Sequence, residues 1–404
     1  MAPRREIAKP GALHDEREIE AVMAVLQTST LDLGPKVAEM ERRTAELLSK
    51  RHGVMVNSGS SALRLAIDLL HCEPGDEIIT SVLTFSTDIA PMVQSGIVPV
   101  LVDVEPDTYV IDVDRIEERI TPRTKAILTP NLVGNCPDWD AIRAIADRHG
   151  LKVVEDSCDV LDSWLRGART GTRSDIGVTS FARTHSITAA GNGGMVALDG
   201  ADDLDECLML RRWGRRSEQY LFGSKQGDDD RFSATVDGLA YDNIFVFENL
   251  GYNFEPSEIG AAYGCVQLDK LEEYNRRRKY AFARYDDWFR EHEDRFVRPA
   301  TTPEVDTTWM LYPFMARDGA GLTRTGTQEF LEERGVPTRV VWSGNITRQP
   351  GFASIPCSVP ADGFPNADRV MEWALMLPTH QGLSSDDVGY IVECLQELVE
   401  ASPS

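Results

Sequence analysis

Apolar residues in this 404-residue chain follow two spacings, one typical of helices and the other typical of buried strands. Residues 16–28 and 35–50 place them three and four positions apart, which predicts two amphipathic helices. From residue 54 onward, short apolar runs alternate with helical segments, as in parallel strands joined by crossover helices. The expected strands cover residues 54–56, 77–82, 98–104, 124–129, 152–154 and 176–181. We therefore expect an α/β fold whose mostly parallel sheet is covered on both faces.

The later part of the chain predicts a different organisation. Residues 216–243 form a long polar stretch without periodicity, and a connection of this length is typically a lid, an interface arm or a disordered segment. A long charged helix over residues 268–291 then leads into a smaller α+β region. The expected elements of this region are strands at 309–316 and 338–343 and helices at 326–335 and 385–400. The predicted divisions are an N-terminal arm and helix (1–34), a large domain (35–270) and a small C-terminal domain (271–404).

The formal net charge is −23, which makes the surface strongly acidic. Such a surface repels nucleic acid and anionic membranes, so we expect neither as a partner. No apolar stretch approaches the ~18 residues of a membrane-spanning helix. A phosphorylated small molecule is compatible with this charge if its pocket is lined by backbone amides or is locally basic.

The seven cysteines are far apart in sequence and include no CxC or CxxC pair. This spacing argues against a zinc site, an iron–sulfur cluster and a disulfide framework, so we expect no bound metal. Unpaired cysteines are typical of the reducing cytoplasm, which is the expected location.

The candidate chemistry is concentrated in residues 153–194, where two expected strands end in polar side chains. Glu155 and Asp156 close the first strand, and Ser180 and His185 flank the turn after the second. The carboxyl ends of parallel strands are where α/β enzymes bind their ligands. An aspartate there is suited to pair with a protonated heterocycle nitrogen, and a histidine is suited to transfer protons near neutral pH. A helix cap and a structural histidine are the competing interpretations.

A turn of small residues at 57–61 lies between an expected strand and an expected helix. Its backbone N–H groups and the helix dipole favour an anion such as a phosphate. Ordinary serine capping of the helix is the alternative. Phe85 follows another expected strand, where it either stacks on a flat ligand or joins the core.

Ordered motifs along nearly the whole chain resemble the DegT/DnrJ/EryC1/StrS family of sugar aminotransferases, which depend on pyridoxal phosphate (PLP). The motifs read NSGSSAL, PGDEIIT, TFSTDIAP, GIVPVLVDVEPDTYVID, RTKAILTP, VVEDSCD, TSFARTH, GNGGMV and GYNFEPSEIGAA. The resemblance implies a fold-type-I, aspartate aminotransferase-like architecture. It has a mostly parallel seven-stranded sheet in a large domain and a smaller C-terminal α+β domain.

The resemblance is strongest toward a branch of sugar 3-dehydratases in which a histidine replaces the cofactor-binding lysine. That histidine corresponds to His185 in TSFARTHSIT, and the branch also shares EDSCD, LRRWGR, NLGYNFEPSE and SGNITRQP. Shifting the alignment by one residue would place Ser186 at the same position. His185 is preferred because HSIT parallels the His-His-Ile-Thr of the branch.

The same resemblance assigns cofactor-binding roles to individual residues. It implies that Gly59, Ser60 and Ser180 hold the cofactor phosphate. Phe85 would stack on the cofactor ring. Asp156 would pair with the pyridine nitrogen and keep it protonated, which makes the ring an electron sink.

Further roles concern the substrate and a second subunit. Asp159 occupies the place where aminotransferases of the family have Gln or His near the ring hydroxyl. Asn253 would reach the cofactor phosphate of a neighbouring subunit, which implies a homodimer with a shared active site. Ser186 and Arg348 are expected to bind the substrate, and Arg348 lies in the polar segment SGNITRQP.

Three departures from the family pattern shape the expected activity. No lysine occurs between Lys152 and Lys225, so the cofactor would be held noncovalently, most naturally as pyridoxamine phosphate (PMP). No cysteine lies in residues 213–233, which begin with the WGR motif and correspond to the segment where iron–sulfur members of the branch have a cysteine cluster. The loop after His185 is one residue longer, and Asn192 stands where the family usually has Glu.

The expected function is therefore C3 dehydration of a 4-keto-6-deoxy sugar, which we expect to be nucleotide-linked. His185 would act as base and acid, and L-glutamate would regenerate PMP. One alternative is an aminotransferase-type enzyme that recruits another lysine. Two others are a dehydratase acting on an unusual sugar or cyclitol and a non-catalytic member of the family.

Overall fold

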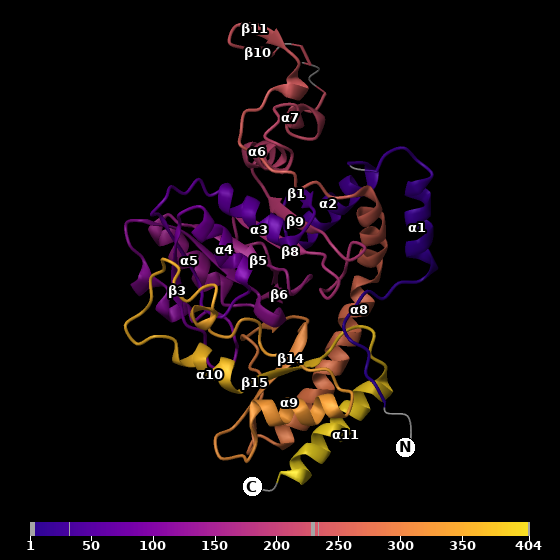
Figure 1. Ribbon diagram of the computed structural model, residues 1–404, viewed down its shortest axis with the longest axis vertical. Helices are drawn as coiled ribbons and strands as arrows, with labels where there is room; N and C mark the ends of the chain where they lie inside the picture. Colours follow the sequence, from indigo (N-terminus) through magenta and orange to yellow (C-terminus); the bar gives the residue numbers. More distant parts are fainter. Residues whose placement is uncertain (1–4, 32, 228–230, 233, 403–404) are drawn as a thin grey trace.

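The computed structural model describes residues 5–31, 33–227, 231–232 and 234–402 (Figure 1). Its larger part is built on a seven-stranded sheet in the order β1–β9–β8–β5–β4–β2–β3. The strands are β1 (His52–Val56), β9 (Gly194–Leu198), β8 (Ile176–Ser180), β5 (Lys152–Asp156), β4 (Thr124–Pro130), β2 (Glu77–Ser81) and β3 (Val98–Val102). β9 is antiparallel to both neighbours, and the other pairings are parallel. The predicted mostly parallel seven-stranded sheet is confirmed.

Helices cover both faces of this sheet because successive strand residues point to opposite sides. Val154 packs in the cluster that contains apolar residues of α3 and α6, whereas the adjacent Val153 packs with Trp139 and Ile142 of α5. The helices beside the first face are α3 (Gly59–Asp68), α4 (Ser86–Gln94) and α6 (Ala201–Arg211). Those beside the second are α2 (Pro35–Leu47), α5 (Trp139–His149) and the first part of α8 (Glu258–Glu291). The strands therefore carry continuous apolar runs, as the sequence predicted.

The C-terminal part packs helices on a small antiparallel sheet, and α8 runs from the large sheet into it (Figure 1). The central strand β14 (Leu311–Ala316) pairs with β12 (Phe296–Val297) and β15 (Ala374–Pro378). The accompanying helices are α9 (Arg324–Glu333), α10 (Pro365–Trp373) and α11 (Ser385–Ala401). The division predicted between residues 270 and 271 falls inside α8, and it stays a prediction.

The strand predicted at residues 338–343 is wrong. Only Arg339 forms a bridge, with Met376, and the backbone then turns at Trp342, whose φ is 39°. The apolar residues of this segment had suggested a strand, but Val341 enters the core while Trp342 contributes to the cavity described below.

The polar stretch 216–243 contains more regular structure than its sequence predicted. Its described residues form α7 (Glu218–Leu221) and a hairpin of β10 (Ala234–Val236) and β11 (Leu239–Tyr241), which project away from the sheet (Figure 1). The hairpin turns at Asp237 and Gly238, with φ values of 55° and 80°. An Asp-Gly pair with two positive φ angles is typical of a tight hairpin turn.

The remaining elements lie at the edges of these two parts. α1 (Glu16–Leu26) packs beside α8, and its N-terminus has a capping box formed by Asp15 and Glu18. A small sheet contains β6 (Trp164–Leu165), β7 (Ala168–Arg169) and β13 (Val305–Asp306). Among the described residues, no helix is long and apolar enough to cross a membrane.

Candidate active site

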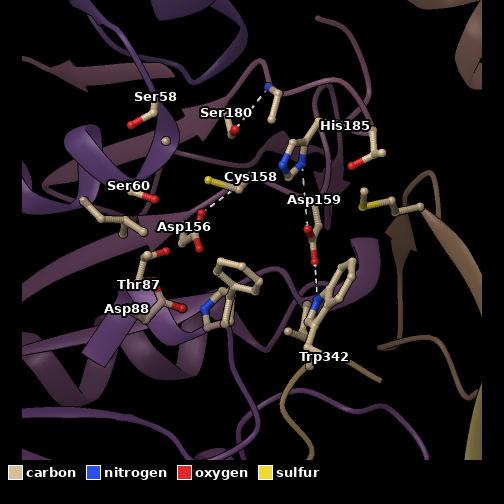
Figure 2. Close-up of a pocket in the computed structure, with 18 of the residues that line it drawn as sticks. Ser58, Ser60, Thr87, Asp88, Asp156, Cys158, Asp159, Ser180, His185 and Trp342 are labelled. Atoms are coloured by element: carbon tan, nitrogen blue, oxygen red, sulfur yellow. Dashed lines mark hydrogen bonds and ion pairs between the residues drawn. The ribbon is translucent and has the colours of Figure 1, made fainter. Parts of the chain in front are cut away.

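A cavity of about 420 Å³ opens where the carboxyl ends of β4, β5 and β8 meet the first turns of α3 and α4. This edge of a parallel sheet is where α/β proteins bind ligands. Figure 2 shows its side chains, which come from both parts of the molecule. The lining residues are Ser58, Gly59, Ser60, Leu63, Phe85, Thr87, Asp88, Pro130, Leu132, Asp156, Cys158, Asp159, Ser180, Ala182, Thr184, His185, Asn192, Met310, Arg339 and Trp342.

The first turn of α3 forms an anion-binding end of the cavity. The Ser58 hydroxyl caps this helix by accepting a hydrogen bond from the Ser61 N–H at 3.1 Å. Gly59 faces Ser180 so closely that a Cβ at residue 59 would lie 2.7 Å from the Ser180 Cβ. Glycine is therefore needed for this approach. The structure brings Gly59, Ser60 and Ser180 together at a helix N-terminus, an arrangement suited to a phosphate.

Asp156 ends β5 and reaches the cavity from a buried position. Its Oδ1 accepts a hydrogen bond from the Cys158 N–H at 2.8 Å. Burial raises the pKa of Asp156 to about 6, and the nearby charge of Asp159 acts in the same direction. Among the described residues, no basic side chain forms an ion pair with Asp156. A cationic ligand group placed against this carboxylate would therefore be strongly stabilised.

His185 lies in the turn after β8, and Figure 2 shows Asp159 between His185 and Trp342, with a contact to each. The His185 Nδ1 is 4.0 Å from Asp159 Oδ1. Asp159 Oδ2 accepts hydrogen bonds from Trp342 Nε1 at 2.9 Å and from the Val133 N–H at 2.8 Å, which fixes the carboxylate. Burial lowers the pKa of His185, although the charge of Asp159 opposes this effect. The imidazole is therefore neutral at neutral pH and able to accept a proton.

The backbone of the His185 turn is held by a buried arginine of α8. Arg278 donates hydrogen bonds to the His185 carbonyl oxygen at 3.3 Å, to the Met310 carbonyl oxygen at 3.0 Å and to Gln381 Oε1 at 2.7 Å. These contacts join the turn to two segments of the C-terminal part. The position of the imidazole therefore depends on how the two parts of the molecule pack.

Phe85 immediately precedes α4 and exposes 54% of its surface, although it lines the cavity. Its ring meets that of Trp342 edge to face, with 6.4 Å between the centroids. The exposed side of the Phe85 ring is available for a flat ligand to stack on, as the sequence predicted for a cofactor ring.

Three of the predicted site residues lie outside the cavity lining. Ser186 is buried next to His185. Arg348 is on the surface, where its guanidinium forms a two-pronged ion pair with Asp368. Asn253 is exposed and bridges to Arg212, so a contact with cofactor phosphate would have to involve another subunit. The roles proposed for these three residues stay predictions.

Several lining residues were not foreseen from the sequence. Arg339 and Trp342 reach the cavity from the segment mistaken for a strand, and Asp88 comes from the first turn of α4. The motif TFSTDIAP contained a signal for Asp88, because a helix that starts next to a strand end directs its first turn at the site. No local pattern distinguishes Arg339 and Trp342, because only packing of the C-terminal part brings them here.

The model of the DegT/DnrJ/EryC1/StrS aminotransferase family matches residues 13–396. The dTDP-4-dehydro-2,6-dideoxy-D-glucose 3-dehydratase of Saccharopolyspora spinosa is 34% identical over 100% of this chain and 88% of its own length.

Two solved structures of GDP-4-keto-6-deoxymannose-3-dehydratase are similar over most of the chain. The Escherichia coli enzyme with bound hydrated PLP superposes with a TM-score of 0.86 and 27% identity, covering 97% of this chain and 100% of the other. A second structure, with a trapped PLP-glutamate geminal diamine, has a TM-score of 0.87 and 26% identity, covering 96% and 100%.

These matches confirm the predicted family and the predicted fold-type-I architecture. The similarity covers 97% of this chain, so it extends over both the large sheet and the C-terminal part. The chain belongs to the DegT/DnrJ/EryC1/StrS aminotransferase family.

Proposed function

We propose that this protein is a PLP/PMP-dependent 3-dehydratase of a 4-keto-6-deoxy sugar, with His185 as the acid and base. The observation that carries the proposal is a partly buried histidine that lines the cavity of a family member whose described lining residues include no lysine. Relatives that are 3-dehydratases, one of them solved with PLP, support it. A nucleotide-linked sugar is proposed because the substrates named for these relatives carry dTDP or GDP.

The residues present fit the proposed cofactor. Its phosphate would be held at the first turn of α3 by Gly59, Ser60 and Ser180, where the close approach of Gly59 leaves a cradle that a Cβ would fill. Asp156 would meet the ring nitrogen, and Phe85 would lie against the ring. When bound, the cofactor supplies an electron sink connected to the sugar carbon atoms.

The side chains of this protein then perform the proton transfers. Neutral His185 accepts the proton that must be removed at the reacting carbon, through the ring nitrogen that does not face Asp159. Asp159 stabilises the resulting imidazolium from 4.0 Å. The protonated His185 donates a proton to the C3 hydroxyl as it leaves, so one residue serves as base and then as acid. A lysine would instead bind PLP covalently, which favours transamination.

The test of this function uses the purified protein with PLP, L-glutamate and a panel of nucleotide-linked 4-keto-6-deoxy sugars, analysed by mass spectrometry. We expect loss of one water from the sugar, a final product without the C3 oxygen, and formation of 2-oxoglutarate. An amino sugar product would contradict the proposal. So would a covalent attachment of PLP to the chain after borohydride reduction.

Arg339 is the proposed contact for an anionic group of glutamate or of the substrate. It lines the cavity, and within the described part of the chain its guanidinium makes no hydrogen bond or ion pair. Its backbone is fixed by two hydrogen bonds to Met376, of 3.2 and 2.7 Å. An arginine held in this way is suited to a carboxylate or a phosphate oxygen.

Replacing Arg339 with Gln is expected to raise the KM for glutamate or for the nucleotide sugar by about 10-fold or more, because a charge-assisted hydrogen bond is lost. Steady-state kinetics with each substrate varied in turn identifies which anion Arg339 meets. Arg348→Gln is the matched variant, because Arg348 already pairs with Asp368 on the surface. A larger KM effect for Arg348→Gln than for Arg339→Gln would reverse this assignment and support the substrate-binding role predicted for Arg348.

We also propose a homodimer that shares its active sites. We define the projecting arm as the described residues between 216 and 250, which are 216–227, 231–232 and 234–250. The arm exposes apolar side chains, and Leu250 is 97% exposed. A second set lies on and after α1. Exposed apolar residues of both sets are Leu221, Phe222, Phe232, Val236, Leu239, Tyr241, Phe245, Phe247, Leu250, Ile19, Met23, Leu26 and Leu31. Apolar surface gathered in this way marks a protein interface, and exposed Asn253 lies directly after the arm.

The wild-type protein is therefore expected to sediment as a dimer in analytical ultracentrifugation. Phe247→Asp combined with Leu250→Asp should shift it toward monomer, because each change buries a charge in the interface. Val359→Asp is the control, since Val359 is also exposed but lies outside the arm and α1. The proposed interface would be contradicted if the wild-type protein were monomeric, or if the double variant dimerised as strongly as the wild type.

The cytoplasmic location also stays a proposal. All seven cysteines are free thiols in the structure, and four of them are buried. Thiols that persist without pairing suit a reducing compartment.

A further inference from the structure

A second buried carboxyl group, Asp88, lies beside Asp156, and the mechanism above does not use it. Asp88 belongs to the first turn of α4 and is fully buried. It lines the cavity, and Figure 2 shows it next to Thr87, on the side of the cavity where Asp156 projects. A carboxyl group in this position requires an explanation, because an ionised carboxylate is costly to bury unless it is paired.

The surroundings of Asp88 provide one hydrogen-bond donor and no cation. Thr84 Oγ1 donates to Asp88 Oδ2. Asp88 Oδ1 is buried and receives no N–H or hydroxyl donor from the described residues. The titratable groups that face Asp88 are Asp156, Cys158 and Asp159, which are neutral or negative. No described Lys, Arg or His forms an ion pair with Asp88.

Two adjacent buried carboxyl groups do not both ionise, because their repulsion adds to the cost of desolvation. Asp156 is the member needed as an anion to stabilise a protonated ring nitrogen. We propose that Asp88 is held as a neutral carboxylic acid that donates a hydrogen bond to the Asp156 carboxylate and so positions it. The inference rests on the proposed role of Asp156, and it makes Asp88 a positioning residue.

The electrostatics of the pair agree with this arrangement. Burial raises the pKa of Asp88 well above its usual range, and the charge of Asp156 raises it further. A hydrogen bond donated by Asp88 to Asp156 would raise the pKa of Asp88 and lower that of Asp156, in agreement with the proposed direction. The proton on Asp88 thus reduces the negative charge of the site without neutralising Asp156.

Infrared difference spectroscopy of the cofactor-free protein tests the protonation of Asp88 directly. At pH 8, the wild-type spectrum minus the Asp88→Asn spectrum is expected to contain the C=O stretch of a carboxylic acid. Asp103→Asn is the control, because Asp103 is a buried carboxylate that accepts the N–H groups of Asn366 and Ala367 at 2.9 and 3.0 Å. That control should lose only a carboxylate band. A carboxylate band in place of the acid band for Asp88 would overturn the proposal.

PMP affinity, measured by fluorescence titration, tests the positioning role. Asp88→Asn keeps a hydrogen-bond donor toward Asp156 and should stay within about 3-fold of wild type. Asp88→Val removes the donor and should weaken PMP binding by about 10-fold, because Asp156 loses a buried hydrogen bond. Equal losses in both variants would overturn the proposal. The infrared result needs no cofactor, so it stands or fails separately from the proposed function and from any folding defect of Asp88→Val.

Discussion

Replacing His185 with asparagine is expected to lower the rate of sugar dehydration by about 10²–10⁴-fold, the contribution typical of a general acid–base group. Asparagine is polar and similar in size, but it neither accepts nor releases a proton near neutral pH. PMP affinity should change little, because the phosphate end and the Asp156 end of the cavity are unaffected. Single-turnover assays analysed by mass spectrometry measure the dehydration, and fluorescence titration measures PMP binding.

The control for this variant is His149→Asn. His149 lies on α5, where it pairs with Glu117 at the surface. Its replacement should leave the dehydration rate unchanged. A His185→Asn rate within about 10-fold of wild type would be too fast for loss of the acid and base, and would contradict the assignment.

Replacing Asp156 with asparagine is expected to reduce the dehydration rate by about 10²–10³-fold. Removing one charge-stabilising group from an active site typically reduces the rate by this factor. The reason is that an amide does not keep the ring nitrogen protonated. Stopped-flow absorbance of the bound cofactor, together with single-turnover product formation, measures the effect. Asp175→Asn serves as the control, because Asp175 pairs with Arg143 outside the cavity lining.

The pH dependence of the Asp156 variant provides an independent readout. Because the pKa of Asp156 is about 6 in the folded protein, this carboxyl takes up a proton as the pH falls through 6. PMP affinity of the wild type should therefore decrease below pH 6 more steeply than that of Asp156→Asn. Similar pH profiles for the two proteins would show that Asp156 does not contact the ring nitrogen.

Replacing Asp156 with asparagine should lower the activity of the protein without lowering its stability against unfolding at pH 8. The folded-state pKa of Asp156 is raised above the ordinary value of 3.8, so the folded protein binds this proton more tightly than the unfolded chain. The contribution of Asp156 to stability is then lost as the pH rises from about 4 through 6. The cofactor-free Asp156→Asn protein is therefore expected to be no less stable than wild type at pH 8. Lower stability would indicate a structural role for Asp156.

Much of the fold was predictable because buried parallel strands require local apolar runs. Such runs correctly indicated β2, β4 and β8, among others. The start of α8 was missed, since the helix begins at Glu258 and not at residue 268. Its first turns contain small residues such as Gly264, where a Cβ would lie 2.9 Å from the Met40 side chain. Because small residues allow this close packing, the first turns of α8 lack the periodic apolar residues from which an amphipathic helix is predicted.

The candidate site was predictable where its residues follow strands. Asp156, Ser180 and His185 were found in this way, because each lies at or just after a strand end. Arg339 and Trp342 come from a segment that is irregular and distant in sequence. Nothing local marks such residues as part of a site, since their position depends on the packing of the C-terminal part against the large sheet.

The sequence by itself determined the family, the sheet and the absence of any lysine between Lys152 and Lys225, because ordered motifs and the absence of a residue type are local facts. Only the tertiary structure decided the electrostatic environment of the site. The pKa values of Asp88, Asp156 and His185 depend on burial and on neighbours from other elements. Desolvation and charge interactions act through space, so they arise only once α4, β5 and the His185 turn are packed around one cavity.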